Sequence, residues 1–147
     1  MLAKYRSYMM LGILAGLAVA GISTPASAAS PDPLQEAVQH GKHLFMDASF
    51  GGNGRHCNSC HRGGGTEAGQ LPDGTAIPSL NNAASIFPRF NRRRGAVITL
   101  QDQVHNCIQG ALQGIAPAPD SKDMVALVSY LTSLSQGKPI DMGGQPQ

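Results

Sequence analysis

Two cysteines and a histidine stand together in the segment Cys57-Asn58-Ser59-Cys60-His61. Thiols three positions apart, with an imidazole directly after the second, are what covalent attachment of haem c requires. The thiols of Cys57 and Cys60 can add to the two vinyl groups of the porphyrin, which leaves His61 beneath the iron as its proximal ligand. A thioredoxin-like disulfide would need a nearby βαβ pattern, and a zinc site would need a second ligand pair; the sequence has neither. The segment therefore predicts one covalently bound haem c.

The beginning of the chain has the pattern of a secretory signal peptide. Lys4 and Arg6 give a positive start, and the apolar run over residues 9–22 is short for a membrane span. The small residues at 26–28 then offer a cleavage site, with an uncleaved membrane anchor as the alternative. We expect residues 1–28 to be a signal peptide cleaved near Ala28, which implies export to the periplasm and no membrane span in the mature chain.

The remaining chain is small and electrically balanced. Removing Lys4 and Arg6 from the eleven basic residues leaves nine, against nine acidic residues. This balance gives no indication of nucleic acid binding. Aromatic residues make up 5% of the sequence and tryptophan is absent, so a buried macrocycle would supply apolar volume that the polypeptide lacks. We expect one cytochrome c domain over residues 29–140 and a flexible tail over residues 141–147.

Three segments have the periodicity of amphipathic helices. The first begins at Asp32, directly before a proline, and the second begins at the N-cap pair of Thr99 and Asp102. The third begins at Asp120 or Ser121. We expect the second helix to end at Gly114 and the third to end at Gly137 and Pro139. The three apolar faces comprise Leu34, Val38, Gly41 and Phe45; Leu100, Val104, Cys107, Ile108 and Ala111; and Met124, Leu127, Val128, Leu131 and Leu134.

The stretch between residues 63 and 98 shows little periodicity, and so long an irregular stretch in a small domain usually has a function. Packing against the haem is the function we expect. Haem motif and helices together resemble class I cytochromes c, in which a proline after the motif places its carbonyl on the proximal histidine. By that resemblance Pro78 orients His61, with an ordinary turn as the alternative.

The same resemblance implies how the helices pack. The first and last helices of class I cytochromes c cross closely, where a small residue meets an aromatic one. Gly41 and Phe45 against Tyr130 and Leu131 fit such a crossing. We therefore expect an all-α fold, a small cytochrome c fold with three to four helices and long loops wrapped round one covalently bound haem.

The second axial ligand decides the redox chemistry of such a haem. The loop of residues 114–119, where class I cytochromes c carry a methionine, has none. Met124 belongs to the last helix and Met142 to the tail. Cys107 is the odd cysteine of an exported chain and lies on an apolar helical face. A small buried hydrophobe and an intermolecular disulfide are alternatives for Cys107, but we predict that His61 and Cys107 are the two metal ligands.

Four arginines, Arg89, Arg92, Arg93 and Arg94, form a basic cluster before the second helix. We favour a solvated loop in which one arginine pairs with a haem propionate. The alternative is a patch beside the haem that binds an anion or a partner protein.

The region around these residues resembles the haem domain of bacterial thiosulfate dehydrogenases and, in part, of Sox cytochromes. The resemblance covers most of residues 57–140. It implies that Cys107 ligates an active-site haem and that Arg93 corresponds to an arginine of the family. The chain departs from those enzymes by Gln103, where they usually have arginine, by Ala111, where they usually have serine, and by its single haem motif. The matching segments are Phe87-Pro88-Arg89-Phe90-Asn91, Val97-Ile98-Thr99-Leu100-Gln101-Asp102, and Pro119-Asp120-Ser121-Lys122-Asp123-Met124 through Leu134-Ser135.

From these features we expect a periplasmic monohaem cytochrome that carries single electrons between redox proteins, in inorganic sulfur oxidation if the resemblance extends to function. It would act alongside other periplasmic redox proteins or as a subunit of a redox complex. The alternative is a thiosulfate dehydrogenase that forms tetrathionate, with Cys107 as catalytic residue and Arg93 holding the anion. A structural or sensory haem subunit is a third possibility.

Overall fold

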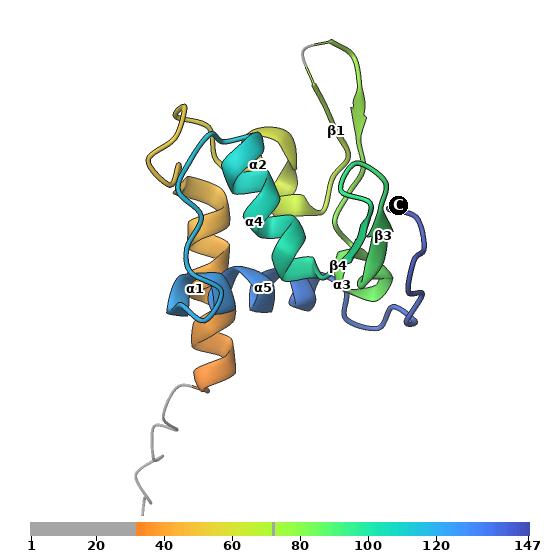
Figure 1. Ribbon diagram of the computed structural model, residues 1–147. Coiled ribbons are helices and arrows are strands. Elements are labelled where there is room, and N and C mark those ends of the chain that lie inside the picture. The colour runs from red at the N-terminus through yellow and green to blue at the C-terminus, as the bar shows by residue number, and fades with distance from the viewer. Residues whose placement is uncertain (1–31, 72) are drawn as a thin grey trace, which may run out of the picture.

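The computed structural model describes residues 32–71 and 73–147, so the predicted signal peptide lies outside the described residues. The described chain is mostly helical, with two short β-hairpins (Figure 1). None of its helices is long and apolar enough to cross a membrane. The elements are α1 (Pro33–Asp47), α2 (Cys57–Cys60), η1 (Gly63–Gly65), β1 (Gly69–Gln70), β2 (Ala76–Ile77), α3 (Ala83–Ile86), β3 (Arg89–Asn91), β4 (Ala96–Ile98), α4 (Leu100–Gly110) and α5 (Lys122–Leu134).

Helices α1 and α5 make the most extensive contact in the molecule, and they cross as expected (Figure 1). A side chain on Gly41 would collide with the backbone carbonyl of Ala126, so glycine is what lets the two backbones approach. One turn later Phe45 meets Tyr130 edge to face, with ring centroids 5.4 Å apart. Leu34, in contrast, is 60% exposed and lies outside the crossing, contrary to the prediction for the first helix.

The core lies between α1, α4 and α5. Its fully buried side chains include Phe45, Ile108, Met124 and Leu127. Tyr130 extends this core to the haem motif, because its hydroxyl donates a hydrogen bond of 2.7 Å to the carbonyl of Gly64. The last helix therefore holds in place the glycine turn that follows the motif.

Both predicted N-caps of the later helices are present. The Thr99 hydroxyl accepts from the backbone of Asp102, whose carboxylate in turn accepts from the backbone of Thr99. Ser121 caps α5 through the backbone N–H of Met124. The predicted end of the second helix was wrong: α4 ends at Gly110, and Ala111 is exposed. The chain turns away there because Gln113 adopts a left-handed conformation, with φ of 54°.

The long stretch predicted to be irregular contains two antiparallel hairpins, β1–β2 and β3–β4, and the one-turn helix α3. The residues of the predicted flexible tail make hydrogen bonds to the rest of the chain. Asp141 and Gly143 donate backbone hydrogen bonds of 2.8 and 2.9 Å to the carbonyls of Ser85 and Ile86. The buried amide of Asn82 bonds to the backbone at positions 145 and 147. Residues 141–147 thus lie against α3.

Candidate haem site

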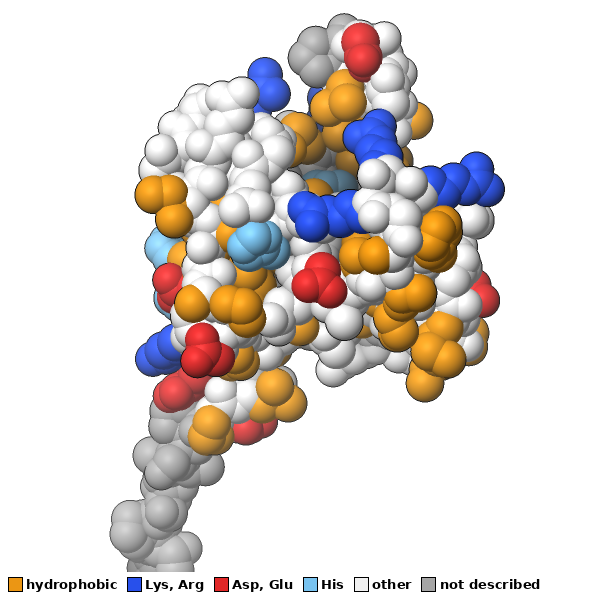
Figure 2. All heavy atoms as spheres, viewed as in Figure 1, with side chains coloured by type: hydrophobic (Ala, Val, Ile, Leu, Met, Phe, Trp, Pro, Cys, Tyr) orange, Lys and Arg blue, Asp and Glu red, His pale blue; other side chains and the backbone are white. Residues whose placement is uncertain are grey.

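A cavity of about 820 Å³ opens between α2, α4 and the β3–β4 hairpin. Its volume falls in the range of roughly 300–1,000 Å³ that is typical of cofactor sites. Figure 2 shows a hollow on this face with basic side chains at its rim and hydrophobic atoms within. The apolar side chains that line the cavity include Phe45, Leu80, Ile86, Phe87, Ile98, Leu100, Val104, Leu127 and Leu131.

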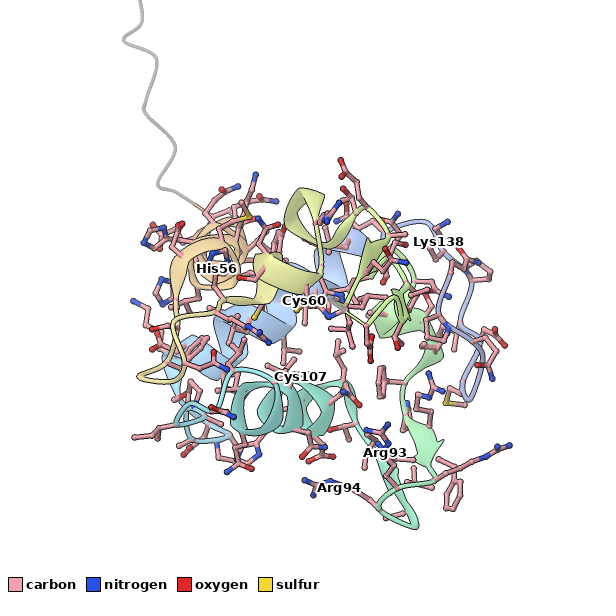
Figure 3. All side chains as sticks on the ribbon, turned by 90° about the horizontal axis from the view of Figure 1, so that it is seen from above. His56, Cys60, Arg93, Arg94, Cys107 and Lys138 are labelled. Carbon is pink, nitrogen blue, oxygen red and sulfur yellow. The ribbon has the colours of Figure 1, made fainter. Side chains whose placement is uncertain are left out.

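Most residues that the sequence predicts for the site meet in this cavity. Cys57, His61 and Pro78 line it from the haem motif and the following loop, and Cys107 lines it from α4. Cys60 is not part of the lining, but it is close enough for its charge to raise the pKa of Cys107. Figure 3 shows Cys60 and Cys107 on facing elements. The three thiols are all free and half-buried.

The apolar surroundings favour the neutral thiol at Cys57 and Cys107. Burial, followed by the charge of Cys107, raises the pKa of Cys57 to about 12. Burial also raises the pKa of Cys107. A bound metal ion reverses this preference, because a thiol that coordinates a cation loses its proton.

His61 is oriented by its surroundings. The centre of its ring lies 6.4 Å from that of Phe45. Burial lowers the pKa of His61, which favours the neutral imidazole that binds metals. The Pro78 carbonyl acts in the opposite direction and raises that pKa. Nδ1 of His61 is nevertheless buried without a hydrogen bond of full geometry. The Pro78 carbonyl therefore lies close to the His61 ring without making a hydrogen bond to Nδ1.

Cys107 has a partner that the sequence did not reveal. The side-chain amide of Gln103, one helical turn earlier, donates a hydrogen bond of 3.1 Å to Cys107 Sγ. This contact lowers the pKa of Cys107, against the larger effect of burial. The sequence does contain a signal for this contact: Gln103 and Cys107 are four residues apart on a predicted helix, and residues at this spacing lie on the same face. From the sequence, Gln103 is only a departure from the enzymes that the chain resembles.

The arginine cluster divides between two environments. Arg89, Arg92 and Arg93 line the haem cavity, whereas Arg94 lines a separate cavity of about 570 Å³ beside α4. Figure 3 shows Arg93 and Arg94 extending from the hairpin near α4. The guanidinium of Arg89 lies 6.0 Å from the ring centre of Phe87, within cation–π range. The sequence did not predict that tail residues Gly143, Gln145 and Pro146 would also line the haem cavity.

These residues fit haem c. Two thiols at vinyl spacing precede an imidazole, the walls are apolar enough to bury a macrocycle, and basic groups are available for its carboxylates. The unpartnered, buried Nδ1 of His61 lies near a carbonyl acceptor, as expected of a histidine whose other nitrogen serves a metal. The comparisons with known proteins agree with this fit.

A family model described as "SoxA/TsdA, cytochrome c domain" matches residues 40–140. The thiosulfate dehydrogenase of Allochromatium vinosum is 32% identical over 125 residues, which cover 81% of this chain and 45% of the relative. That of Psychrobacter arcticus is 34% identical over 107 residues, covering 72% and 31%. This chain therefore spans less than half the length of these relatives.

Solved structures show the same architecture. The thiosulfate dehydrogenase TsdBA from Marichromatium purpuratum matches with a TM-score of 0.61 and 26% identity, over 81% of this chain and 26% of that one. SoxXA from P. pantotrophus matches in fold with a TM-score of 0.59 and 22% identity, over 76% and 37%. The expected cytochrome c fold is confirmed. With the family match over residues 40–140 and the haem motif at the cavity wall, the chain belongs to the SoxA/TsdA cytochrome c family and binds haem c covalently.

Proposed function

We propose that this protein is a periplasmic monohaem cytochrome that carries single electrons during thiosulfate oxidation, in which His61 and Cys107 would hold the haem iron. The observation that carries the proposal is that both side chains line one cavity, from the motif and from α4. The haem iron supplies reversible one-electron exchange when bound. The relatives named thiosulfate dehydrogenase support the process, although this chain spans only part of their length.

The choice of Cys107 rests on where the competing side chains lie. Met124 is fully buried in the core, and Met142 is 66% exposed in the tail. His105 lines the separate cavity beside α4. Of these candidates, only Cys107 lines the cavity that contains His61. A thiolate ligand donates electron density and favours a lower potential than a methionine does.

The remaining residues would hold the cofactor and exclude water. Cys57 and Cys60 anchor it, while Pro78 orients His61. The Gln103 amide fixes Cys107 Sγ on the cavity side of α4. Arg89, which is half-buried and lines the cavity, lies where it can hold a carboxylate of the cofactor.

A second candidate function is thiosulfate dehydrogenation, which is favoured by a specific juxtaposition: Cys107 and Arg93 line the same cavity. Arg93 would hold the thiosulfate anion while Cys107 contacts its sulfur. One observation opposes this function: the uncharged Gln103 stands four residues before Cys107, where the resembling enzymes usually have an arginine. A charge-assisted hydrogen bond to an anion is worth about 1.5–3 kcal/mol, so its loss weakens substrate binding. Ala111 is exposed and does not line the cavity, so its departure from serine carries less weight.

Two measurements test the proposal. Low-temperature electron paramagnetic resonance of the oxidised holoprotein should give a low-spin thiolate signal that disappears in Cys107→Ala. An unchanged spectrum in the variant would refute ligation by Cys107. A steady-state assay with thiosulfate and an artificial acceptor should show no turnover in the parent. Turnover that Cys107→Ala abolishes would instead establish the catalytic function.

A further inference from the structure

The β3–β4 hairpin presents two large apolar side chains to solvent. Phe90 and Val97 are paired across the strands and are 58% and 69% exposed. Directly opposite residues of an antiparallel pair project from the same face of the hairpin, so these two side chains form one apolar surface. An apolar pair kept exposed on a hairpin, and not folded onto the core, is typical of a contact surface.

Three arginines adjoin this pair. Arg92, Arg93 and Arg94 are exposed in the turn, and residues 89–98 contain no acidic residue. In the described part of the chain, none of these arginines is in a salt bridge; the two salt bridges there involve His40 and His43. Asp102 already accepts hydrogen bonds from Thr99, and the charge of Arg94 contributes only a smaller lowering of the Asp102 pKa. The three guanidinium groups are therefore available to an external partner.

The hairpin also forms part of the haem cavity wall. Phe90, Arg92 and Arg93 all line the cavity while remaining exposed. Aromatic and arginine side chains are the types enriched at the centre of protein–protein interfaces. Figure 2 shows basic side chains projecting round the hollow. A protein that docks here approaches the cofactor at the edge of its cavity.

We propose that Phe90, Val97 and Arg92–Arg94, the hairpin patch, dock an acidic one-electron carrier protein. This inference rests on the proposed electron-transfer function. Carboxylates of the partner would pair with the arginines, and its apolar centre would cover Phe90 and Val97. One electron then leaves the reduced cytochrome and reduces the partner's acceptor by one electron. The mature chain has equal numbers of acidic and basic residues, so an arginine cluster confined to the cavity rim favours a redox protein over nucleic acid.

The test measures oxidation of the reduced holoprotein by stopped flow. The protein acceptor is an acidic blue-copper protein such as plant plastocyanin, and the small acceptor is ferricyanide. Arg92→Glu/Arg94→Glu reverses the charge of the patch, with Lys42→Glu/Lys122→Glu as a control of equal charge change at exposed positions elsewhere. Val97→Ser removes apolar surface from the patch without altering charge, at a position outside the haem-cavity lining.

We expect plastocyanin to oxidise the parent at a rate that falls with salt, and the charge reversal to slow this reaction at least tenfold, as electrostatic steering predicts. The control should stay within about twofold of the parent at matched ionic strength. Val97→Ser should slow the reaction with plastocyanin several-fold and leave the reaction with ferricyanide unchanged. An apolar variant that reacts like the parent would show that the arginines serve small anions only and would overturn the docking proposal. A parent that exchanges electrons with neither acceptor would refute the electron-transfer function itself.

Discussion

With Cys107 holding the haem iron as proposed, the hydrogen bond from Gln103 to Cys107 should raise the reduction potential of the bound haem, and Gln103→Leu should lower it. The donor lies 3.1 Å from Sγ and lines the same cavity, so it acts on the sulfur directly. A ligand sulfur carries more negative charge when the iron is reduced, and a donor to it stabilises that state more. Removing the donor therefore favours the oxidised form.

The size of the shift follows from the strength of the bond. Hydrogen bonds to charged groups contribute about 1.5–3 kcal/mol. A tenfold change in equilibrium is about 1.36 kcal/mol, or about 59 mV for one electron, so losing the whole bond would shift the potential by roughly 65–130 mV. That range is an upper limit, because the oxidised state retains part of the bond.

The assay is a potentiometric titration of the haem absorbance in parent and variants. Gln109→Leu is the matched control, because Gln109 is on the same helix but exposed. Gln103→Arg supplies a cationic donor and should move the potential in the opposite direction. If Gln103→Leu left the potential equal to that of Gln109→Leu, or raised it, Gln103 would have no role in tuning the sulfur.

Three further predictions concern stability. Gly41→Ala should lower the free energy of unfolding by about 1–3 kcal/mol, because the added Cβ collides with α5. Gly110→Ala, where the Cβ meets no other atom, should raise the free energy of unfolding by about 0.5–1 kcal/mol. Urea unfolding measures both changes. Tyr130→Phe should cost about 1–3 kcal/mol in the same assay, because it leaves a buried carbonyl without its donor. Hydrogen bonds from Thr99 lower the pKa of Asp102. The stability that this N-cap contributes is therefore complete above the unfolded-state pKa of the carboxyl and is lost as pH falls through the folded-state pKa. Asp102→Asn should make the urea midpoint less dependent on pH in the acid range.

The helices were predictable because local chemistry determines them. Asp32, Thr99 and Ser121 cap helices through hydrogen bonds to their own first turns, a pattern that the sequence alone contains. The Gly41 crossing was predicted from family resemblance and is present. The end of α4 was not predictable from residue types, because it depends on a left-handed Gln113 and on the backbone of Phe50 packing against Gly114.

The segment between the motif and α4 could be predicted only as a region with a function. Its hairpins are two or three residues per strand, too short for a period-two pattern to emerge. The attachment of the tail was equally hidden, because it depends on Asn82, whose amide bonds to backbone more than sixty residues away. A polar tail sequence does not distinguish a free segment from one held in this way.

The candidate site shows where sequence reasoning ends. The motif names Cys57, Cys60 and His61 by spacing, because covalent attachment imposes that spacing on any fold. Cys107 was predicted because the loop of residues 114–119 has no methionine and because of the family resemblance. In the structure it lines the same cavity as His61. The sequence shows Gln103 only as a residue that differs from the arginine of the resembling enzymes. In the structure its uncharged side-chain amide donates a hydrogen bond to Cys107 Sγ, at a position where those enzymes have a cation. A neutral donor can hold Cys107 in place without attracting an anionic substrate, which favours electron transfer over thiosulfate chemistry at this haem.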